Sequence, residues 1–427
     1  MTTSVYAQLT LPKLPVPDPS TVQLPRLSDS ATEVTSRLDS IVIDTTSELD
    51  SRSERLLRAA RVRALLRANP KILETDNNGA PVLRGQVISL SPSAQSLQAA
   101  NAAGFTVAQD ETIDGLNIHI VTLQAPRGMA ASRALRQLRT LDPGGSYDYN
   151  HVYTQSAANH VATAVSPANN STSVNEVYPN ARVGLIDSGV DPTHPAFRTN
   201  HIHNWGCDEH IVSSAHGTAV ASLLVGQSPD FSGAAPGAAL YAADVYCGQT
   251  VGGAATRIAS AIAWLAQQQV PVINISLVGP DNAILKTLVS ALIMSGHLIV
   301  AAVGNDGPAA APLYPASYPG VIGVTAVDAH SRVLMEAGRG KQVMLSAPGA
   351  DLIAAGLQGK TVNVRGTSFA APLVAGLLAI HLDKPDAEAA KIALNTLISQ
   401  ARDLGPKGFD TTYGYGVVGE SLRVTPK

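Results

Sequence analysis

One stretch of the chain, Gly366–Gly376, places a serine directly after a Gly-Thr pair and ahead of a helix-like run of small residues. That serine, Ser368, would lie at a helix start, where unpaired N–H groups and the positive end of the helix dipole stabilise a negatively charged oxygen. Gly366 permits a backbone conformation that residues with a side chain rarely adopt. The pattern indicates a nucleophile for acyl transfer, although a serine in this position also serves as an ordinary helix N-cap.

Two further residues with acid–base chemistry occupy positions where a turn or a cap is the usual role. Asp187 follows the apolar run Val183–Ile186 and precedes a Ser-Gly turn. His216 opens a His-Gly-Thr sequence at an expected helix start. A nucleophilic serine needs a base within hydrogen-bond reach and a third group that orients the base. Taken together, Asp187, His216 and Ser368 could supply all three functions.

The elements that must position these residues alternate, after residue 181, between unbroken apolar strands and helical patterns. Strands of this kind are buried on both faces, as in a parallel sheet covered by helices. Chemistry in such α/β sheets lies at the carboxyl ends of the strands. We expect strands at Val183–Ile186, Ala239–Val245, Val272–Leu277, Leu298–Val303 and Val321–Val327, and helices at Thr218–Val225, Ala254–Gln268, Ala283–Ser295 and Pro372–His381.

A smaller unit is expected ahead of this sheet, at residues 81–153. Its strands and helices are expected at Val82–Ser91, Ser93–Ala103, Phe105–Ala108, Leu116–Gln124, Met129–Leu141 and Ser146–Val152. The resulting order, β-α-β-β-α-β, is that of the ferredoxin-like α+β fold, one sheet with two helices on one face. Residues 154–178, rich in Ser, Thr, Ala and Asn, are expected to form an accessible linker that a protease can cut.

The motifs resemble those of the subtilisin-like serine proteases, the subtilase family. The resemblance covers most of residues 179–422, which implies a subtilisin-like catalytic domain with a doubly wound parallel sheet. It rests on the residues around Asp187, His216 and Ser368 and on Asn305 in a Gly-Asn-Asp-Gly sequence. In this family the serine attacks a peptide carbonyl, the histidine transfers its proton and the aspartate orients the histidine. Asn305 is then expected to donate to the oxyanion.

The resemblance also implies a cleft that binds an extended peptide by strand addition. The expected substrate-binding residues are Ser276, Leu277, Val278, Gly279, Ala302, Gly304 and Leu313. Leu277 and Leu313 equally suit an ordinary core. The family commonly has glycine in place of Val278 and often in place of Leu313, so we expect a tighter and shorter pocket for the residue before the cleaved bond.

A ferredoxin-like domain ahead of a subtilase domain resembles the pro-domain of this family, an intramolecular chaperone and inhibitor. A parallel sheet needs many non-local contacts and folds slowly, so a template that docks on its helices lowers the folding barrier. The sequence around Tyr153 and Thr154 resembles the junction at which such pro-domains are cut, and we predict cleavage after Tyr153. An ordinary accessory domain is the alternative.

Two cysteines, Cys207 and Cys247, leave a choice between one disulfide and two buried thiols. The resemblance brings them to neighbouring strand ends, which implies a disulfide and agrees with an exported protein.

Residues 225–231 look shorter than the calcium-binding loop of many relatives and contain only Asp230 as a carboxylate ligand. We therefore predict no cofactor and find no clear ligand set for calcium.

Composition narrows the partners and the location. The net charge is −3 and no block of Lys or Arg occurs, so no electrostatic footprint for nucleic acid or an anionic membrane is present. No apolar run reaches the length of a membrane span. We expect a monomer that binds peptide or protein substrates and its own pro-domain.

The N-terminal region is expected to contain two segments of different character. Residues 1–27 form a Pro-rich tail, in which Ser4–Ala7 resembles the end of a signal peptide whose earlier part is missing; this favours export. Residues 28–80 form a helical segment of unassigned role.

The favoured function is therefore an exported serine endopeptidase made as a self-processing zymogen. A catalytically silent, peptide-binding subtilase fold is a second hypothesis, against which the intact four-residue site argues. An α/β-hydrolase esterase is a weaker one, because Ser368 lacks a Gly-x-Ser-x-Gly elbow and Asp187 precedes it in the chain.

Overall fold

The structure is a computed structural model that describes residues 60–113, 118–156, 162–164 and 176–424. The described residues belong to one compact unit, Asp50–Lys427. The Pro-rich tail predicted at residues 1–27, most of the helical segment predicted at 28–80 and much of the linker predicted at 154–178 lie outside the described residues. None of the helices in the described part combines the length and the apolar character needed to cross a bilayer.

The larger domain is built on a parallel sheet, which confirms the predicted fold class. In the described part of the chain this sheet has seven strands in the order β15-β14-β13-β11-β8-β10-β9. They are β8 (Arg182–Asp187), β9 (Ile202–Trp205), β10 (Ala239–Asp244), β11 (Val272–Ile275), β13 (Leu298–Ala302), β14 (Ile322–Val327) and β15 (Val343–Pro348). The inner strands are almost entirely buried because helices cover both faces of the sheet.

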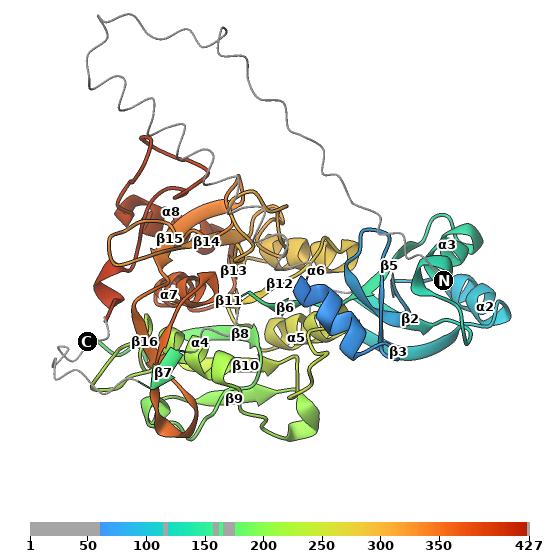
Figure 1. Cartoon of the computed structure of the whole chain (residues 1–427), viewed down its shortest axis with the longest axis horizontal. Coiled ribbons are helices and arrows are strands. Elements are labelled where there is room, and N and C mark those ends of the chain that lie inside the picture. Colours follow the sequence, from blue (N-terminus) through green and yellow to red (C-terminus); the bar gives the residue numbers. More distant parts are fainter. Residues whose placement is uncertain (1–59, 114–117, 157–161, 165–175, 425–427) are drawn as a thin grey trace, which may run out of the picture. The chain divides into compact units, whose positions relative to one another are not determined.

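Helices cover this sheet from two sides (Figure 1). They are α4 (Ala215–Val225), α5 (Ala255–Gln267), α6 (Ala283–Met294), α7 (Thr367–Ala379) and α8 (Ala387–Gln400). One core lies between the sheet and α4, α7 and α8, and a second core lies between the sheet and α5 and α6. Strand β15 and helix α8 were not predicted. Ser346 and Pro348 interrupt the apolar pattern of β15, and only the inner face of α8 is buried.

Shorter elements complete this domain. Two small antiparallel sheets join β12 (Leu277–Val278) with β6 (Thr154–Gln155), and β16 (Leu352–Ala355) with β17 (Thr361–Val364) and β7 (Ala162–Ala164). Single turns of 3₁₀-helix occur at η3 (Pro195–Phe197), η4 (Cys207–Glu209), η5 (Leu357–Gly359) and η6 (Glu420–Leu422). The β6–β12 pair matters most for function, because it connects the two domains at the candidate site.

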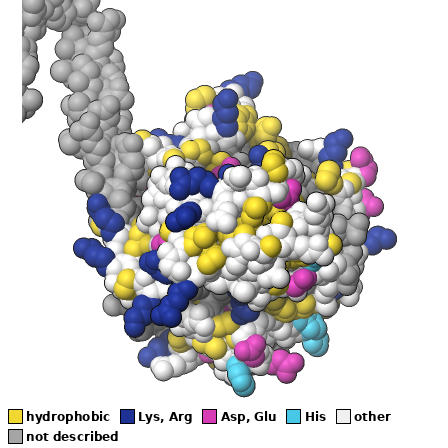
Figure 2. Space-filling model, turned by 90° about the vertical axis from the view of Figure 1, so that its right-hand side faces the viewer, with side chains coloured by type: hydrophobic (Ala, Val, Ile, Leu, Met, Phe, Trp, Pro, Cys, Tyr) yellow, Lys and Arg dark blue, Asp and Glu magenta, His cyan; other side chains and the backbone are white. Residues whose placement is uncertain are grey.

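The smaller domain has the predicted ferredoxin-like order. Its elements are β2 (Pro81–Leu90), α2 (Ala94–Ala102), β3 (Thr106–Ile113), β4 (Ile118–Gln124), α3 (Ala131–Leu141) and β5 (Ser146–His151). Strands β2, β4 and β3 are adjacent and β5 pairs with the other edge of β2, all antiparallel. Helix α3 buries Leu135 and Leu138 and exposes Arg133 and Arg136, as an amphipathic helix on a sheet must. On the face shown in Figure 2, Lys and Arg side chains are interspersed with hydrophobic and uncharged groups.

The region before residue 81 differs from the helical segment that the sequence predicts. A helix occupies residues 60–68 and ends before Pro70, which cannot continue it. Strand β1 (Leu73–Thr75) then pairs with the first residues of β2, so the sheet of the small domain begins earlier than expected. Because the buried Leu73 alternates with more exposed neighbours, the pattern here is that of a strand.

The small domain satisfies the N-terminal ends of two helices of the larger domain. The Ala283 N–H at the start of α6 donates to the Asp148 carboxylate at 2.7 Å. The Thr256 N–H at the start of α5 donates to the Asn150 side chain at 3.3 Å. Helix starts carry N–H groups without helical partners, and a carboxylate there also interacts favourably with the helix dipole. Strand β5, which carries both acceptors, is therefore anchored to α5 and α6.

Candidate active site

Three elements bring Asp187, His216 and Ser368 to one end of the parallel sheet. Asp187 is the last residue of β8, and His216 and Ser368 are the second residues of α4 and α7. Gly366, the residue before α7, has φ of 135°, a conformation that favours glycine. Asp187 ends β8, and Ser368 is tied through Ser276 to the end of β11, so the residues lie at the carboxyl end of the sheet, where the fold class places chemistry.

A buried hydrogen bond joins Asp187 to His216. The distance from His216 Nδ1 to Asp187 Oδ1 is 2.9 Å, and the two side chains are 7% and 0% exposed. Ser188 donates to the same carboxylate oxygen from its main-chain N–H at 2.6 Å and from its hydroxyl at 2.9 Å. Because a carboxylate only accepts, Nδ1 must carry the proton. Nε2, which makes no hydrogen bond among the described residues, is then free to act as a base.

Ser368 is fully buried beside a serine of the segment that follows the small domain. Its hydroxyl hydrogen-bonds to the hydroxyl of Ser156. Pro372, four residues later in α7, has no N–H to bond the Ser368 carbonyl in the usual helical pattern. The Ser276 hydroxyl donates to that carbonyl instead, at 3.1 Å. Ser276 therefore fixes the turn of the helix that carries the candidate nucleophile.

The Asn305 side chain donates to the main-chain carbonyl of Ser156. The oxygen of the same side chain, Asn305 Oδ1, accepts a hydrogen bond from the Thr367 N–H at 3.1 Å. The Thr367 hydroxyl in turn accepts from the Gly304 N–H at 3.2 Å. An amide whose oxygen faces an N–H must present its NH₂ group on the opposite side. The site thus holds one oriented amide donor against a peptide carbonyl.

The segment that ends at Ser156 lies in the site as an extended strand. β6 pairs antiparallel with β12, with Gln155 opposite Leu277 and Thr154 opposite Val278. The Ser156 N–H donates to the Ser276 carbonyl at 3.4 Å. Strand addition of this kind supplies main-chain hydrogen bonds regardless of the side chains of the bound peptide. β6 is therefore held on β12 in the way that strand addition holds a peptide.

The predicted substrate-binding residues divide into three groups. Ser276 and Val278 flank the bound strand through the contacts above, and Gly279 lies against the ring of Tyr153. Leu277 pairs through its main chain while its side chain is buried in the core. Ala302 is likewise buried in the core, on the side of α4 and α7. Gly304 and Leu313 lie in contact with each other, as described further below.

The structure does not bring the predicted cleavage bond, Tyr153–Thr154, to the candidate nucleophile. The residue that reaches both Ser368 and Asn305 is Ser156, three residues later: its hydroxyl contacts Ser368 and its carbonyl accepts from Asn305. Sequence reasoning missed Ser156 because the register of β6 against β12 decides which carbonyl faces the amide. It also missed Ser188, whose position directly after Asp187 was the available signal.

Cys207 and Cys247 form a disulfide with a Cα–Cα distance of 5.2 Å. Together with Asp244 they are the one group of metal-binding side chains that lies close together in the described part of the chain. Sulfurs joined in a disulfide are not thiolate ligands, so these residues do not fit a metal. Burial, with the charge of nearby Asp187, raises the pKa of Asp244 despite its hydrogen bonds from main-chain N–H groups.

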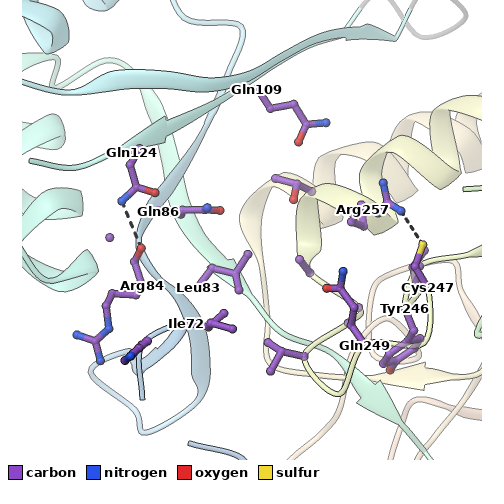
Figure 3. A pocket seen from close by; sticks show the side chains of 18 of the residues that line it. Ile72, Leu83, Arg84, Gln86, Gln109, Gln124, Tyr246, Cys247, Gln249 and Arg257 are labelled. Atoms are coloured by element: carbon purple, nitrogen blue, oxygen red, sulfur yellow. Dashed lines mark hydrogen bonds between the residues drawn. The ribbon is translucent and has the colours of Figure 1, made fainter. Parts of the chain in front are cut away.

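A cavity of about 1000 Å³ lies between the small domain and the disulfide, away from the three candidate residues. Figure 3 shows Arg84 and Gln86 of β2 on one side and Arg257 of α5 on the other. Neither Asp187, His216 nor Ser368 lines this space. The cavity is a gap between the domains rather than the candidate active site.

The helix over residues 60–68 also reaches the bound segment. Its residues Arg61, Val62 and Leu65 line a cavity of about 490 Å³ together with Tyr153–Ser156. The guanidinium of Arg61 lies 3.7 Å from the Asp306 carboxylate, next to Asn305. The segment upstream of the small domain therefore contributes to the surroundings of the cleft.

A buried Asp–His pair, a serine at a helix start and an oriented amide on a parallel sheet are the groups that a serine protease needs. Residues 178–416 match the sequence model of the Subtilase family. This match spans more than half of the chain, which therefore belongs to the Subtilase family and is a subtilisin-like serine endopeptidase acting on proteins. The predicted family and enzyme class are thus confirmed.

Proteins similar to this chain include two subtilisins and one solved structure. Subtilisin E from Bacillus subtilis (strain 168) is 32% identical over 300 residues, which are 67% of this chain and 77% of that protein. Subtilisin from Bacillus pumilus is 34% identical over 249 residues, 56% of this chain and 89% of that protein. Fervidolysin from Fervidobacterium pennivorans, a keratinolytic enzyme, has a similar fold with a TM-score of 0.66 and 21% identity, covering 82% of this chain and 62% of its own.

Proposed function

We propose that this chain is the zymogen of a self-processing endopeptidase whose catalytic triad is Asp187, His216 and Ser368. The observation that carries the proposal is the position of the Ser156 carbonyl, which accepts from the Asn305 amide while the Ser156 hydroxyl contacts Ser368. Ser156 thus contacts both the proposed nucleophile and the proposed oxyanion donor, which supports cleavage after this residue.

The proposed reaction begins with attack of Ser368 Oγ on the carbonyl carbon of Ser156. His216 Nε2 takes the serine proton, and Asp187 stabilises the imidazolium that forms. The negative charge on the carbonyl oxygen is stabilised by the Asn305 amide and by the main-chain N–H of Ser368 at the start of α7. The C–N bond to Ala157 then breaks, and His216 donates its proton to the departing amine. Water, activated by His216, hydrolyses the resulting ester.

In this proposal the small domain is a pro-domain that folds with the enzyme and inhibits it. Its strand β5 is anchored through Asp148 and Asn150 to α6 and α5, the helices that cover one face of the parallel sheet. Its C-terminal residues then occupy the place of a substrate in β6. A template that contacts two helices and the cleft at once can both assist folding of the sheet and exclude other peptides.

We propose that the first cut falls between Ser156 and Ala157 rather than after Tyr153. The purified full chain should convert with time into two fragments, and N-terminal sequencing of the larger one should begin at Ala157. The register of β6 on β12 is the physical reason, because a strand cannot slip by three residues without losing its paired positions. A new N-terminus at Thr154 would favour the earlier expectation and contradict this register.

Replacing Asn305 by alanine should slow self-processing by about 10²- to 10³-fold, because the oxyanion loses a preorganised donor. The measurement is the first-order rate of fragment formation, followed on a gel. Asn395→Ala, the same change at an exposed site on α8, is the control and should process at the wild-type rate. A rate for Asn305→Ala within about threefold of wild type would contradict the assigned role.

We further propose that the enzyme is exported and works as a monomer. The Cys207–Cys247 disulfide supports export, because disulfides persist in oxidising compartments and are rare in the cytosol. Cell fractionation that finds the processed enzyme only in the cytoplasm would contradict export. Light scattering that gives the mass of a dimer would contradict the monomer.

A further inference from the structure

The Tyr153 side chain makes specific contacts in addition to those of the main chain. It is fully buried, and its hydroxyl donates to the main-chain carbonyl of Pro280 at 2.7 Å. The ring lies against Gly279, where a β-carbon would be 2.5 Å from the ring. Glycine at this position therefore makes room for an aromatic ring in the wall of the cleft.

The main chain of Tyr153 is held from both sides as well. Its N–H donates to the Gly253 carbonyl at 2.8 Å, and its carbonyl accepts from the Tyr246 hydroxyl at 3.0 Å. Burial raises the pKa of the Tyr153 hydroxyl, so this group stays protonated and remains a donor. The cleft thus supplies the Pro280 carbonyl as an acceptor for this hydroxyl, with the Tyr318 side chain beside it.

The space around the residue before the cut is small. Ser156 is 4% exposed and lies between the Ser276 carbonyl and the Asn305 amide. The side chains of Val278 and Leu313 both approach Gly304 beside it. A β-carbon at Gly304 would lie 2.5 Å from Leu313 Cδ1 and 3.5 Å from Val278 Cγ1. Gly304 precedes Asn305, which binds the Ser156 carbonyl, so these two branched side chains narrow the cleft wall next to the residue before the cut.

We propose that the enzyme selects substrates with a small residue, such as Ser or Ala, before the cleaved bond and a tyrosine three positions earlier. This inference rests on the proposed function, since it treats Tyr153–Ser156 as a peptide bound for cleavage. The two substrate positions are selected by different interactions. Leu313 and Val278 exclude a large side chain by volume, whereas the Pro280 carbonyl distinguishes tyrosine from phenylalanine by its hydrogen bond. A site built to bond a hydroxyl discriminates strongly against the analogue that lacks it, because its buried partner is left unpaired.

The test uses the self-processed chain after the released small domain has been removed, with internally quenched peptides that have the sequence of residues 151–160. Replacing the tyrosine of the peptide by phenylalanine should lower kcat/KM by about 10- to 100-fold. Replacing the serine before the cut by phenylalanine should lower it by about 100-fold. Two control peptides carry tyrosine or phenylalanine in place of Thr154. They should be cleaved at the same rate, because the structure shows no hydrogen bond to the Thr154 side chain among the described residues.

A variant of the pocket separates the volume effect from peptide chemistry. Leu313→Gly should raise the ratio of kcat/KM for the phenylalanine peptide to that for the serine peptide by about tenfold. The ratio does not depend on how much of the variant folds. Leu404→Gly, at a half-buried leucine in a loop that does not line the bound segment, is the matched control and should leave the ratio unchanged.

Each outcome bears on a different part of the proposal. Equal or faster cleavage of the phenylalanine-for-tyrosine peptide would overturn hydroxyl recognition. A large residue before the cut accepted as well as serine, or a Leu313→Gly ratio equal to wild type, would overturn the restricted pocket. If the processed chain cleaves none of the peptides, as a Ser368→Ala chain would, the proposed function fails and this inference fails with it.

Discussion

Replacing Ser368 by alanine should leave the chain at full length indefinitely and abolish cleavage of added peptides. The proposed nucleophile is lost while the surrounding helix, whose first turn is held by Ser276 and Asn305, is retained. Removal of the nucleophile from a serine protease triad lowers the rate by about 10⁶-fold. The measurement is the amount of full-length chain on a gel over days, compared with the wild-type chain over minutes to hours.

Two controls make this result specific to Ser368. Ser399→Ala makes the same chemical change on the exposed side of α8 and should process like wild type. A trace of active wild-type enzyme added to the Ser368→Ala chain tests whether the uncut bond remains cleavable. Self-processing of the Ser368→Ala chain at a rate near that of wild type would show that another residue, or a contaminating protease, makes the cut.

The second large effect is expected from Asp187→Asn, which should slow processing by about 10⁴-fold. The asparagine side chain can donate to Nδ1 of His216 in place of accepting from it. The imidazole would then carry its proton on Nε2, the atom that must accept the Ser368 proton. The change is nearly isosteric, so the histidine is expected to stay in place with the wrong tautomer.

The rate of processing should be compared with the thermal unfolding of the same variant. Asp383→Asn, at an exposed site, is the control for the loss of one negative charge and should leave the rate unchanged. A fall in rate with a preserved unfolding midpoint supports the orienting role of Asp187. Processing of Asp187→Asn within about tenfold of wild type would show that the base does not depend on this carboxylate.

Much of the fold follows from local pattern. The unbroken apolar runs of β8, β11 and β13 predict a buried parallel sheet, because only strands covered on both faces lack polar alternation. The small domain was likewise predicted element by element. β1 was missed because three residues carry too short a pattern to separate a strand from the end of a helix.

In the candidate site, too, some residues were predicted from the sequence and some contacts were found only in the structure. Asp187, His216, Asn305 and Ser368 were expected from short motifs, since each stands at a strand end, loop or helix start that its neighbours specify. Ser188 and Ser276 were not assigned their contacts in advance. Ser188 follows Asp187 directly and contacts its carboxylate locally, whereas the contact of Ser276 with the Ser368 carbonyl arises only when the segment after β11 packs against α7.

The sequence by itself determined the class of the fold, the four residues that carry the proposed chemistry and the presence of a ferredoxin-like domain. Those features depend on periodicity and on residues close in the chain. Only the tertiary structure decided which carbonyl accepts from Asn305, that of Ser156 rather than that of Tyr153, and which side chain fills the buried pocket at Gly279. The reason is that strand register and pocket volume are set by contacts between residues more than a hundred positions apart, which no local pattern encodes.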